Sequence, residues 1–381
     1  MNILIVHNIY STPGGEEQVV EMQRKLFSQA GHNVTIYYRN YSEIKSWKLG
    51  KIKSLLTALI NPHAAKQIKD IVIEKQIDVV FIHNLYPIIS PYFLKYISKL
   101  PVKKVMFLHN YRLICPIGLF LRDGVPCEKC GKGARELNCV IHKCEGSIAG
   151  SIGYALRGFT ARVFKLYKNN VDVFVPTTRF QKEKLEGYGY SGKQMSVVPN
   201  FTDFPPIEQD TQRDGSVLYV GRFSKEKGYD LVFEAARQLP DTIFKMAGRY
   251  SQEEIENSQL PPNIQLLGEI DKESLTHHYR KSSVLLFPTR CYESFPLTIL
   301  EAGLNKLPIV AAGIGACSSI IEHEKNGLLF TPSNVKSLVD CLEKGLSDTE
   351  LLHAISESNY QTTLSSFSKS NYIDKVTSII G

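Results

Sequence analysis

The chain of 381 residues is long enough for about two domains, and its hydrophobic content of 43% is ordinary for a globular protein. No apolar run approaches the ~20 residues of a membrane-spanning helix, so none is predicted. The net charge of +7 is uneven, because residues 1–200 carry 28 Lys and Arg against 14 Asp and Glu, and the remainder is acidic. A basic first half indicates an anionic partner such as a lipid surface, a nucleic acid or a phosphorylated substrate, although a merely solvated surface explains it too.

The first predicted element is a strand. Residues 3–6 are apolar with no basic segment before them, which is typical of a buried strand and not of a signal peptide, so we expect a cytoplasmic protein. Gly14 and Gly15 then open a helix that Gly31 ends, and residues 34–38 form the second strand. A glycine pair at this point lets a ligand approach the backbone, but a plain tight turn uses the same residues.

Two segments of the basic half combine apolar and charged residues. Residues 45–69 place six lysines among apolar side chains, which fits a basic amphipathic segment on a membrane or an ordinary surface helix. Residues 148–168 carry one apolar stripe at helical spacing, with Arg157, Arg162 and two lysines off the stripe. That helix either packs in the core with a basic outer face or meets lipid phosphates.

Histidines end two further predicted strands. Residues 78–82 lead into His83, and residues 104–108 lead into His109, each followed by asparagine. In open α/β sheets, ligands lie at the carboxyl ends of the strands. A lone histidine after a strand is more often structural, so we favour a functional role for His109 and a structural one for His83.

Five of the eight cysteines lie within residues 115–144. In a cytosolic protein, clustered cysteines indicate metal ligands rather than disulfides, and four thiolates around zinc form a closed structural site. The preferred ligands are Cys115, Cys127, Cys130 and Cys144. Cys139 or His142 is the alternative for one of them, and reduced buried thiols are the alternative for the whole cluster.

The remaining pattern predicts two sheets. Residues 171–176 and 195–199 complete the first, and the Pro- and Asp-rich residues 200–215 indicate a linker. The second half repeats the strand–helix alternation, with strands predicted over residues 216–220, 242–246, 264–267, 283–287, 308–312 and 327–330. Alternating units mean mostly parallel sheets covered on both faces, so the fold class is α/β with two doubly wound Rossmann-like domains facing a cleft.

Two cations follow the first strand of the second half. Arg222 and Lys227 come after it at the carboxyl edge of the predicted sheet, with Gly228 next. Arginine grips phosphate with a planar fork and lysine acts as a point charge, so the pair can neutralise a diphosphate without a metal. An exposed charged loop is the alternative.

Glu293 and Glu301 flank a predicted helix start at Phe295, Pro296 and Leu297. Proline is favoured at the first helical position, where we place Pro296. The N–H groups of a helix start form a ready phosphate site. A carboxylate on each side suits a ligand with hydroxyls on both sides of a phosphate, as in a nucleotide sugar. The alternative is a solvated Glu293 and a helix-capping Glu301.

These motifs together resemble a known family. Gly221-Arg222, Glu226-Lys227-Gly228, the pair Glu293 and Glu301 with seven residues between them, and Asn326-Gly327-Leu328-Leu329 resemble the retaining glycosyltransferases of family 4, which have the GT-B fold. The resemblance covers nearly the whole chain through Gly14-Gly15, His109 and Val198-Pro199-Asn200. The cysteine segment after His109-Asn110-Tyr111-Arg112 resembles a subgroup found among bacterial polysaccharide enzymes.

The resemblance implies roles for single residues. Arg222 and Lys227 hold the donor diphosphate, Glu301 binds the ribose hydroxyls, and Glu293 binds the donor hexose. The helix start at 295–297 belongs to the donor site. His109 lies by the donor sugar and the developing charge, and Gly15 backs the phosphates. Ser319 stands where the family often has an acidic residue, which leaves recognition of the donor hexose open.

The resemblance also implies the organisation of the chain. Residues 1–200 plus 366–381 form an acceptor-side domain that contains the insert 115–144 and receives the last helix, and residues 201–365 form the nucleotide-sugar domain. The implied enzyme is a hexosyltransferase that moves a hexose from a UDP- or GDP-sugar to a hydroxyl of a lipid-linked saccharide in cell-surface polysaccharide synthesis.

We further expect a structural zinc, no catalytic metal and no nucleic-acid partner. The basic first domain predicts peripheral contact with the inner face of the cell membrane. Two alternative functions stay open, a sugar-nucleotide epimerase and a non-catalytic, zinc-stabilised subunit that binds nucleotide sugars.

Overall fold

The computed structural model describes residues 1–11, 14–208, 211–256 and 259–381. The chain divides into two compact units, which we call the N-unit (residues 1–120, 128–200 and 372–381) and the C-unit (residues 121–127 and 201–371). The sequence assigned the whole insert 115–144 to the first domain, whereas residues 121–127 group with the C-unit. The expected linker includes residues 209 and 210, which lie outside the described residues.

The N-unit is built from parallel strands that alternate with helices. In chain order its elements are β1 (Asn2–Ile9), α1 (Gly15–Gln29), β2 (Asn33–Asn40), η1 (Tyr41–Ser46), α2 (Gly50–Leu59), α3 (Pro62–Glu74), β3 (Val79–Ile82), α4 (Phe93–Tyr96), β4 (Lys103–Leu108), η2 (Lys129–Gly131), α5 (Leu137–Ile141), α6 (Ile148–Val163), β7 (Val173–Pro176), α7 (Arg179–Gly187), η3 (Gly192–Gln194) and, from residue 372 onward, α15 (Lys369–Ile380).

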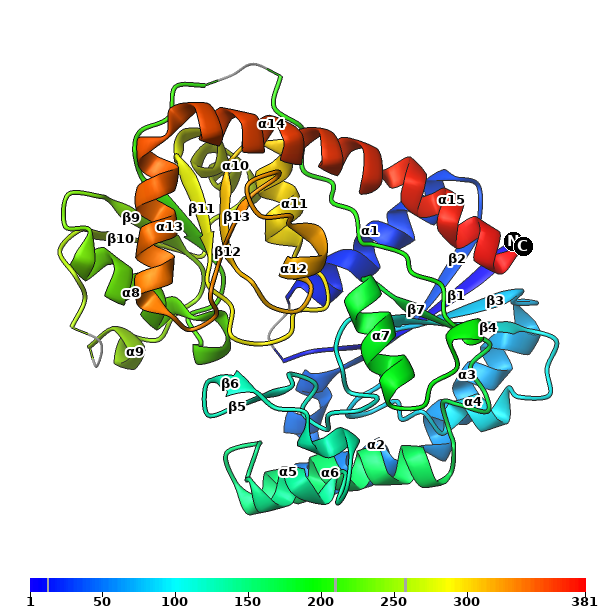
Figure 1. The fold of residues 1–381 in the computed structure, drawn as a ribbon. Helices are drawn as coiled ribbons and strands as arrows, with labels where there is room; N and C mark the ends of the chain where they lie inside the picture. The colour runs from blue at the N-terminus through cyan, green and yellow to red at the C-terminus, as the bar shows by residue number, and fades with distance from the viewer. Residues whose placement is uncertain (12–13, 209–210, 257–258) are drawn as a thin grey trace. The chain divides into compact units, whose positions relative to one another are not determined.

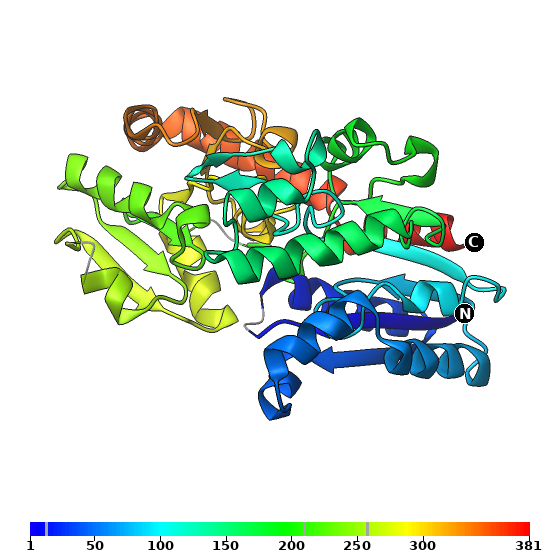
Figure 2. The ribbon, with the colours of Figure 1, turned by 90° about the horizontal axis from the view of Figure 1, so that it is seen from below.

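The described strands of the N-unit sheet have the order β2-β1-β3-β4-β7 and pair in parallel. Its central strands are continuous apolar runs, because helices cover both faces (Figures 1 and 2). Residues 3–6 of β1 and 79–82 of β3 are fully buried. One sequence prediction is wrong here: residues 195–199 form no strand, since Met195 makes only an isolated bridge to Phe174.

The C-unit repeats this plan. Its elements are β5 (Leu121–Arg122), β6 (Val125–Pro126), β8 (Val217–Val220), η4 (Lys225–Lys227), α8 (Tyr229–Gln238), β9 (Phe244–Ala247), α9 (Gln252–Glu256), β10 (Ile264–Gly268), α10 (Lys272–Lys281), β11 (Val284–Phe287), α11 (Leu297–Leu304), β12 (Ile309–Ala312), α12 (Cys317–Ile320), β13 (Leu328–Phe330), α13 (Val335–Ser347) and α14 (Thr349–Ser366).

The main sheet of the C-unit has the order β10-β9-β8-β11-β12-β13 in the described part of the chain, all parallel. Two buried clusters cover its faces. One contains side chains of α8 and α13, including Val232 and Leu338, and the other contains side chains of α10, α11 and α12, including Tyr279 and Ile299. The six strands predicted for this half are confirmed.

Strand order fixes where ligands bind in such sheets. In the N-unit the chain runs outward from β1 to β2, then from β3 toward β7 on the other side, so the direction reverses between β1 and β3. In the C-unit the reversal falls between β8 and β11. Ligands of doubly wound folds bind at the carboxyl ends of the strands beside such a switch point. Candidate ligand-binding residues are therefore expected at the carboxyl ends of the strands beside these two switch points.

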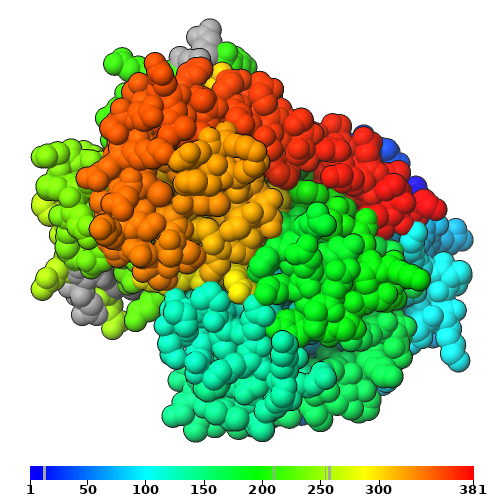
Figure 3. All heavy atoms as spheres, in the orientation of Figure 1, coloured from blue at the N-terminus to red at the C-terminus, as the bar shows by residue number. Residues whose placement is uncertain are grey.

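The basic apolar segments lie on the surface of the N-unit. Residues 45–69 are interrupted at Leu49, which has a φ of +55°, and at Asn61, which caps α3, so they form η1, α2 and the start of α3. On α6 most of the predicted apolar stripe is exposed, including Phe159 at 49%, whereas Arg157, predicted off the stripe, is buried. Figure 3 shows the blue-green region around α6 at the surface. No helix in the described part of the chain is long and apolar enough to cross a membrane.

Candidate active site

The two predicted phosphate-binding cations follow β8 at the C-unit switch point. Arg222 is exposed, and its guanidinium lies 3.3 Å from the carboxylate of Glu226. Lys227 ends the short turn η4 before α8. Gly228, next in the chain, has a φ of +73°, and a Cβ there would lie 2.0 Å from the carbonyl oxygen of Pro288. Only glycine fits this position, and it sets the turn that presents Lys227.

Lys227 and Glu293 form an ion pair between the ends of β8 and β11. Nζ of Lys227 donates to Oε1 of Glu293 at 2.7 Å, and the hydroxyl of Thr289 donates to the same oxygen at 3.1 Å. Burial alone would lower the pKa of Lys227, but the carboxylate of Glu293 outweighs it and the pKa is raised. Lys227 is therefore a firmly charged cation, already neutralised by a carboxylate.

The helix start between the two carboxylates is anchored by apolar packing. α11 begins at Leu297, and Pro296 precedes it as the N-cap with a ψ of 109°. The prediction that Pro296 is the first helical residue is wrong by one position, because its ψ is extended. Phe295 is buried against Phe367, with ring centroids 5.4 Å apart, and Leu297 is buried. Pro296 makes no side-chain hydrogen bond to the start of α11, so the first backbone N–H groups of this helix can meet an anion.

Glu301 lies in the second turn of α11 and is 6% exposed. Its Oε2 accepts a hydrogen bond of 2.7 Å from the hydroxyl of Tyr279. Burial raises the pKa of Glu301 to about 7, and the hydrogen bond from Tyr279 limits the rise. Near neutral pH the side chain thus exists in both forms, and either form can hydrogen-bond a ligand hydroxyl.

In the N-unit, Gly15 is exposed and is the first residue of α1. Residues 12 and 13 before it lie outside the described residues. The N–H of Gly14 donates to Oε2 of Glu17 at 2.8 Å, and the N–H of Tyr10 donates to Oε1 of Glu17 at 3.0 Å. A carboxylate of the chain itself therefore caps this helix start, and a role of Gly15 toward phosphate stays a prediction.

His109 follows β4 and is held in a chain of hydrogen bonds. Its Nε2 lies 2.8 Å from Nδ1 of His83, and Nε2 of His83 lies 2.9 Å from Oε1 of Gln23. Gln23 donates from Nε2 to the hydroxyl of Tyr372 on α15 at 2.8 Å. Burial lowers the pKa of both His83 and His109, so both rings are neutral near pH 7.

Because both histidine rings are neutral, the hydrogen bonds that link His109, His83 and Gln23 can run in only one direction. The amide oxygen of Gln23 accepts, so His83 donates from Nε2 and accepts at Nδ1. His109 consequently donates from Nε2, and its tautomer and ring orientation are set by His83. The structural role predicted for His83 is thus one of positioning. Gln23 and Tyr372 were missed, because nothing in the sequence places residues 349 positions apart in contact.

Arg112 belongs to a second network that the sequence did not predict. The hydroxyl of Tyr10 donates to Oε2 of Glu16 at 2.9 Å, and Nη1 of Arg112 donates to that hydroxyl at 2.6 Å and to Oδ1 of Asn84 at 3.0 Å. This network joins the end of β1, the start of α1 and the loop after β4. The sequence feature that could have indicated this network is the His109-Asn110-Tyr111-Arg112 motif, which contains Arg112 but does not reveal its hydrogen-bond partners.

The cysteines do not reproduce the predicted zinc set. The pKa of Cys139 is raised to about 12 by burial and then by Cys144 and Cys115, so these three sulfurs are neighbours. Among the described residues no group of three or more His, Cys, Asp and Glu side chains is placed to hold a metal ion. Zinc at Cys115, Cys127, Cys130 and Cys144 stays a sequence prediction that metal analysis of the purified protein can decide.

Comparison with known proteins adds the family. Residues 13–204 match the model described as Glycosyltransferase Family 4, and residues 201–362 match Glycosyl transferases group 1. An exopolysaccharide phosphotransferase of Streptomyces coelicolor is 28% identical over 54% of this chain, and the match spans 23% of that protein's length. An uncharacterised 42.6 kDa protein in the cps region of Klebsiella pneumoniae is 24% identical over 79% of this chain and 82% of its own.

Solved structures show the same fold. The sucrose-phosphate synthase of Thermosynechococcus elongatus superimposes with a TM-score of 0.73 at 16% identity, over 99% of this chain and 98% of that one. At this identity the likeness shows the fold, and it extends over both Rossmann-like units. The chain belongs to glycosyltransferase family 4 and has the GT-B fold.

Proposed function

We propose that the protein transfers a hexose, with retained anomeric configuration, from a UDP- or GDP-sugar to a hydroxyl of a lipid-linked saccharide in cell-surface polysaccharide synthesis. The observation that carries this proposal is the pair of Lys227 and Glu293 at the C-unit switch point, beside the uncapped start of α11. A cation, a carboxylate and helix N–H groups in one place suit a sugar diphosphate. The polysaccharide context is supported by the name of the Streptomyces relative.

The chemistry of the proposed reaction centres on the leaving group. When the bond between the hexose and the diphosphate breaks, negative charge develops on the diphosphate, and preorganised positive groups stabilise it best. Lys227, Arg222 and the N–H groups of α11 supply such groups without a catalytic metal. As the donor enters, its phosphate competes with Glu293 for Lys227, which leaves the carboxylate of Glu293 able to accept hydrogen bonds from the hexose hydroxyls.

Two further residues complete the proposed donor site. Glu301 accepts from the ribose hydroxyls, and its position is fixed by the hydrogen bond from Tyr279. His109 is neutral and oriented by His83, so it acts by hydrogen bonding near the sugar rather than by charge. A phosphate oxygen of the donor takes the proton of the acceptor hydroxyl in this proposal.

We also propose that the N-unit contacts the membrane peripherally at its inner face. α2 and α6 pack against each other, and so do α5 and α6. All three helices expose large apolar side chains, namely Ile52, Leu56, Leu137, Ile141, Ile148, Ile152, Phe159 and Val163. Lysines 51 and 53 on α2 are exposed beside them. Apolar side chains with adjacent lysines favour an anionic lipid surface.

The test is slow donor hydrolysis by the purified protein, with a panel of UDP-, GDP- and ADP-sugars. We expect one donor class to release its nucleoside diphosphate, which identifies the base and supports a transferase. Interconversion of sugars without release supports the epimerase instead. If no donor turns over and free nucleotide still binds, the protein is a binding subunit and the proposal fails.

A further inference from the structure

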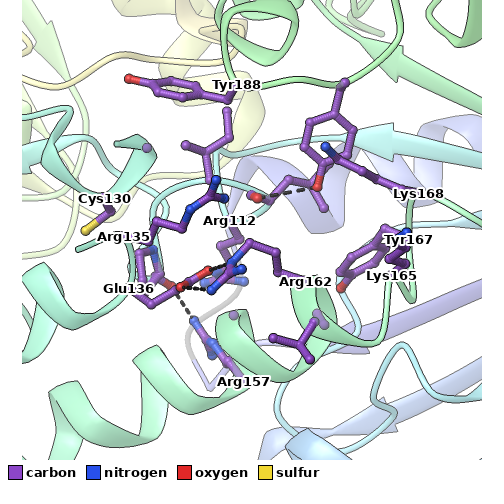
Figure 4. A pocket seen from close by; sticks show the side chains of 18 of the residues that line it. Arg112, Cys130, Arg135, Glu136, Arg157, Arg162, Lys165, Tyr167, Lys168 and Tyr188 are labelled. Carbon is purple, nitrogen blue, oxygen red and sulfur yellow. Dashed lines mark hydrogen bonds and ion pairs between the residues drawn. The ribbon is translucent and has the colours of Figure 1, made fainter. Parts of the chain in front are cut away.

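A cavity of about 360 Å³ in the N-unit is not explained by the donor site (Figure 4). Its walls come from the loops after β3 and β4, the cysteine segment, α6 with the residues that follow it, and the residues that follow α7. Four tyrosines contribute aromatic surface, namely Tyr86, Tyr167, Tyr188 and Tyr190. We call it the basic pocket, because its charges are strongly unbalanced.

Six cations and one carboxylate are among the described residues that line the basic pocket. The carboxylate, Glu136, is already bound by Arg162 through two hydrogen bonds of 2.7 and 2.9 Å. The other cations are Arg112, Arg135, Arg157, Lys165 and Lys168, and none of these five forms an ion pair with a carboxylate of the described chain. The pocket therefore has an excess of positive charge that the protein does not neutralise.

Arg157 is the innermost of these cations and is only 8% exposed. Its guanidinium lies over the rings of Tyr154 and Tyr86, at 3.7 and 4.6 Å from their centroids, and donates to the carbonyl oxygen of Pro116 at 2.8 Å. Burial and then the charge of Arg112 lower the pKa of Arg157. A buried cation beside another cation is costly unless an anion accompanies it.

The other cations add to the excess of positive charge in the basic pocket. Nε of Arg112 is buried and has no hydrogen-bond partner within the described chain. Arg135, Lys165 and Lys168 are exposed at the outer part of the pocket. The pKa of Lys168 is lowered by partial burial and then by the charges of Arg135 and Lys165, so these like charges are close together.

We propose that the basic pocket binds a phosphate or diphosphate group of the acceptor. Arginine forks and lysine point charges are the groups that bind phosphate in proteins, and the tyrosine walls suit an attached sugar ring. Arg112, Tyr86 and Tyr167 also line a smaller pocket that contains His109, so a phosphate held here lies next to the proposed site of transfer. The inference that this phosphate belongs to the acceptor rests on the proposed function, whereas the inference that the pocket binds phosphate does not.

The experiment is calorimetric titration of the full chain with inorganic pyrophosphate. It uses an Arg222→Gln/Lys227→Gln background, so that the donor site does not take up the probe. We compare Arg135→Gln/Lys165→Gln with Lys66→Gln/Lys99→Gln, which removes two exposed lysines outside the pocket. The outer pair is chosen because its side chains are exposed and its loss spares the buried Arg157.

We expect pyrophosphate to bind, its affinity to fall about tenfold or more in the pocket variant, and little change in the control. Titration with a prenyl diphosphate in detergent micelles then distinguishes a lipid-linked acceptor from a water-soluble one. Tighter binding than pyrophosphate indicates a lipid-linked acceptor, and equal binding indicates a water-soluble phosphorylated one. No binding of pyrophosphate, equal loss in both variants, or selective binding of glucuronate would overturn the proposal, whatever the result of the donor assay.

Discussion

The ion pair between Lys227 and Glu293 defines the state of the donor site before any ligand enters. Nζ of Lys227 lies 2.7 Å from Oε1 of Glu293, and the hydroxyl of Thr289 donates to the same oxygen. A sugar diphosphate that binds Lys227 must displace this carboxylate from the ammonium group. The sequence named both residues, but it assigned them to different parts of the donor and did not predict that they pair.

The first prediction concerns Lys227. Replacing it with Gln removes the most buried cation of the donor site, so we expect the affinity for the free nucleoside diphosphate to fall about tenfold or more. Lys225→Gln is the matched control, because Lys225 is exposed two residues earlier in the same turn. Isothermal titration calorimetry measures the affinity of both variants for the nucleoside diphosphate. Equal affinities would show that Lys227 does not bind the diphosphate.

The second prediction concerns Glu301, whose pKa is raised to about 7 by burial. In the unfolded chain it ionises near pH 4.5, so stability is lost as pH rises from about 4.5 to 7 and stays lower above that. Glu301→Gln avoids this cost. At about 1.4 kcal/mol per pKa unit, it should gain at most roughly 3.5 kcal/mol at pH 8 and little at pH 5.

Thermal unfolding of wild type and Glu301→Gln at the two pH values measures this difference. The same variant should bind the nucleoside diphosphate more weakly, since the proposed ribose contact is altered. A variant that is less stable than wild type at pH 8 would contradict the burial argument.

At the scale of single elements, α6 shows what periodicity can and cannot predict. The spacing correctly predicted a helix from residue 148, which ends at Val163. It also predicted one apolar stripe, but most of that stripe is exposed and Arg157 is buried. Hydropathy alone cannot tell which face a helix buries when a basic pocket lies on one side and an apolar surface on the other.

The third prediction tests the exposed face of α6. Ile152→Ser/Phe159→Ser should weaken binding to vesicles that contain anionic lipid by about tenfold or more, because each side chain loses apolar area that would enter the lipid. Ile73→Ser, on the exposed face of α3, is the control. Co-sedimentation with vesicles gives the readout, and undiminished binding of the double variant would exclude this face.

The helix α15 brings the end of the chain into the N-unit. Tyr372 is buried and accepts a hydrogen bond from Gln23, which also orients His83 and through it His109. The return of a final helix was implied by the family resemblance. Its link to the histidine pair depends on contacts between distant parts of the sequence, which one sequence does not reveal.

The fourth prediction follows from this link. Tyr372→Phe leaves a buried N–H of Gln23 without its acceptor, so we expect a loss of roughly 1–3 kcal/mol in the free energy of unfolding. The variant should also lower turnover, because His109 loses its fixed orientation. Ser378→Ala, on the exposed side of the same helix, should change neither the denaturant midpoint nor the rate. A Tyr372→Phe protein that keeps wild-type stability would contradict the proposed series of hydrogen bonds from Tyr372 to His109.

At the scale of the whole molecule, the sequence predicted the fold better than the site. Buried parallel strands are continuous apolar runs, so eleven of the twelve predicted strands are found, and residues 195–199 are the exception. The charges of Arg222 and Lys227 after β8 also followed from the sequence, whereas the turn that Gly228 sets did not. The hydrogen-bond partners Thr289, Tyr279, Gln23 and Tyr372 did not, because tertiary contacts alone bring them to the site.

The measurement that tests the central claim most directly compares wild type with Glu293→Gln in the donor hydrolysis assay, together with titration of the free nucleoside diphosphate. We predict that release of the nucleotide falls about 100-fold, because the donor hexose is no longer positioned. The nucleotide itself should bind as tightly or more tightly, because Lys227 is freed from its carboxylate. Unchanged turnover, or turnover and binding lost together, would contradict the account.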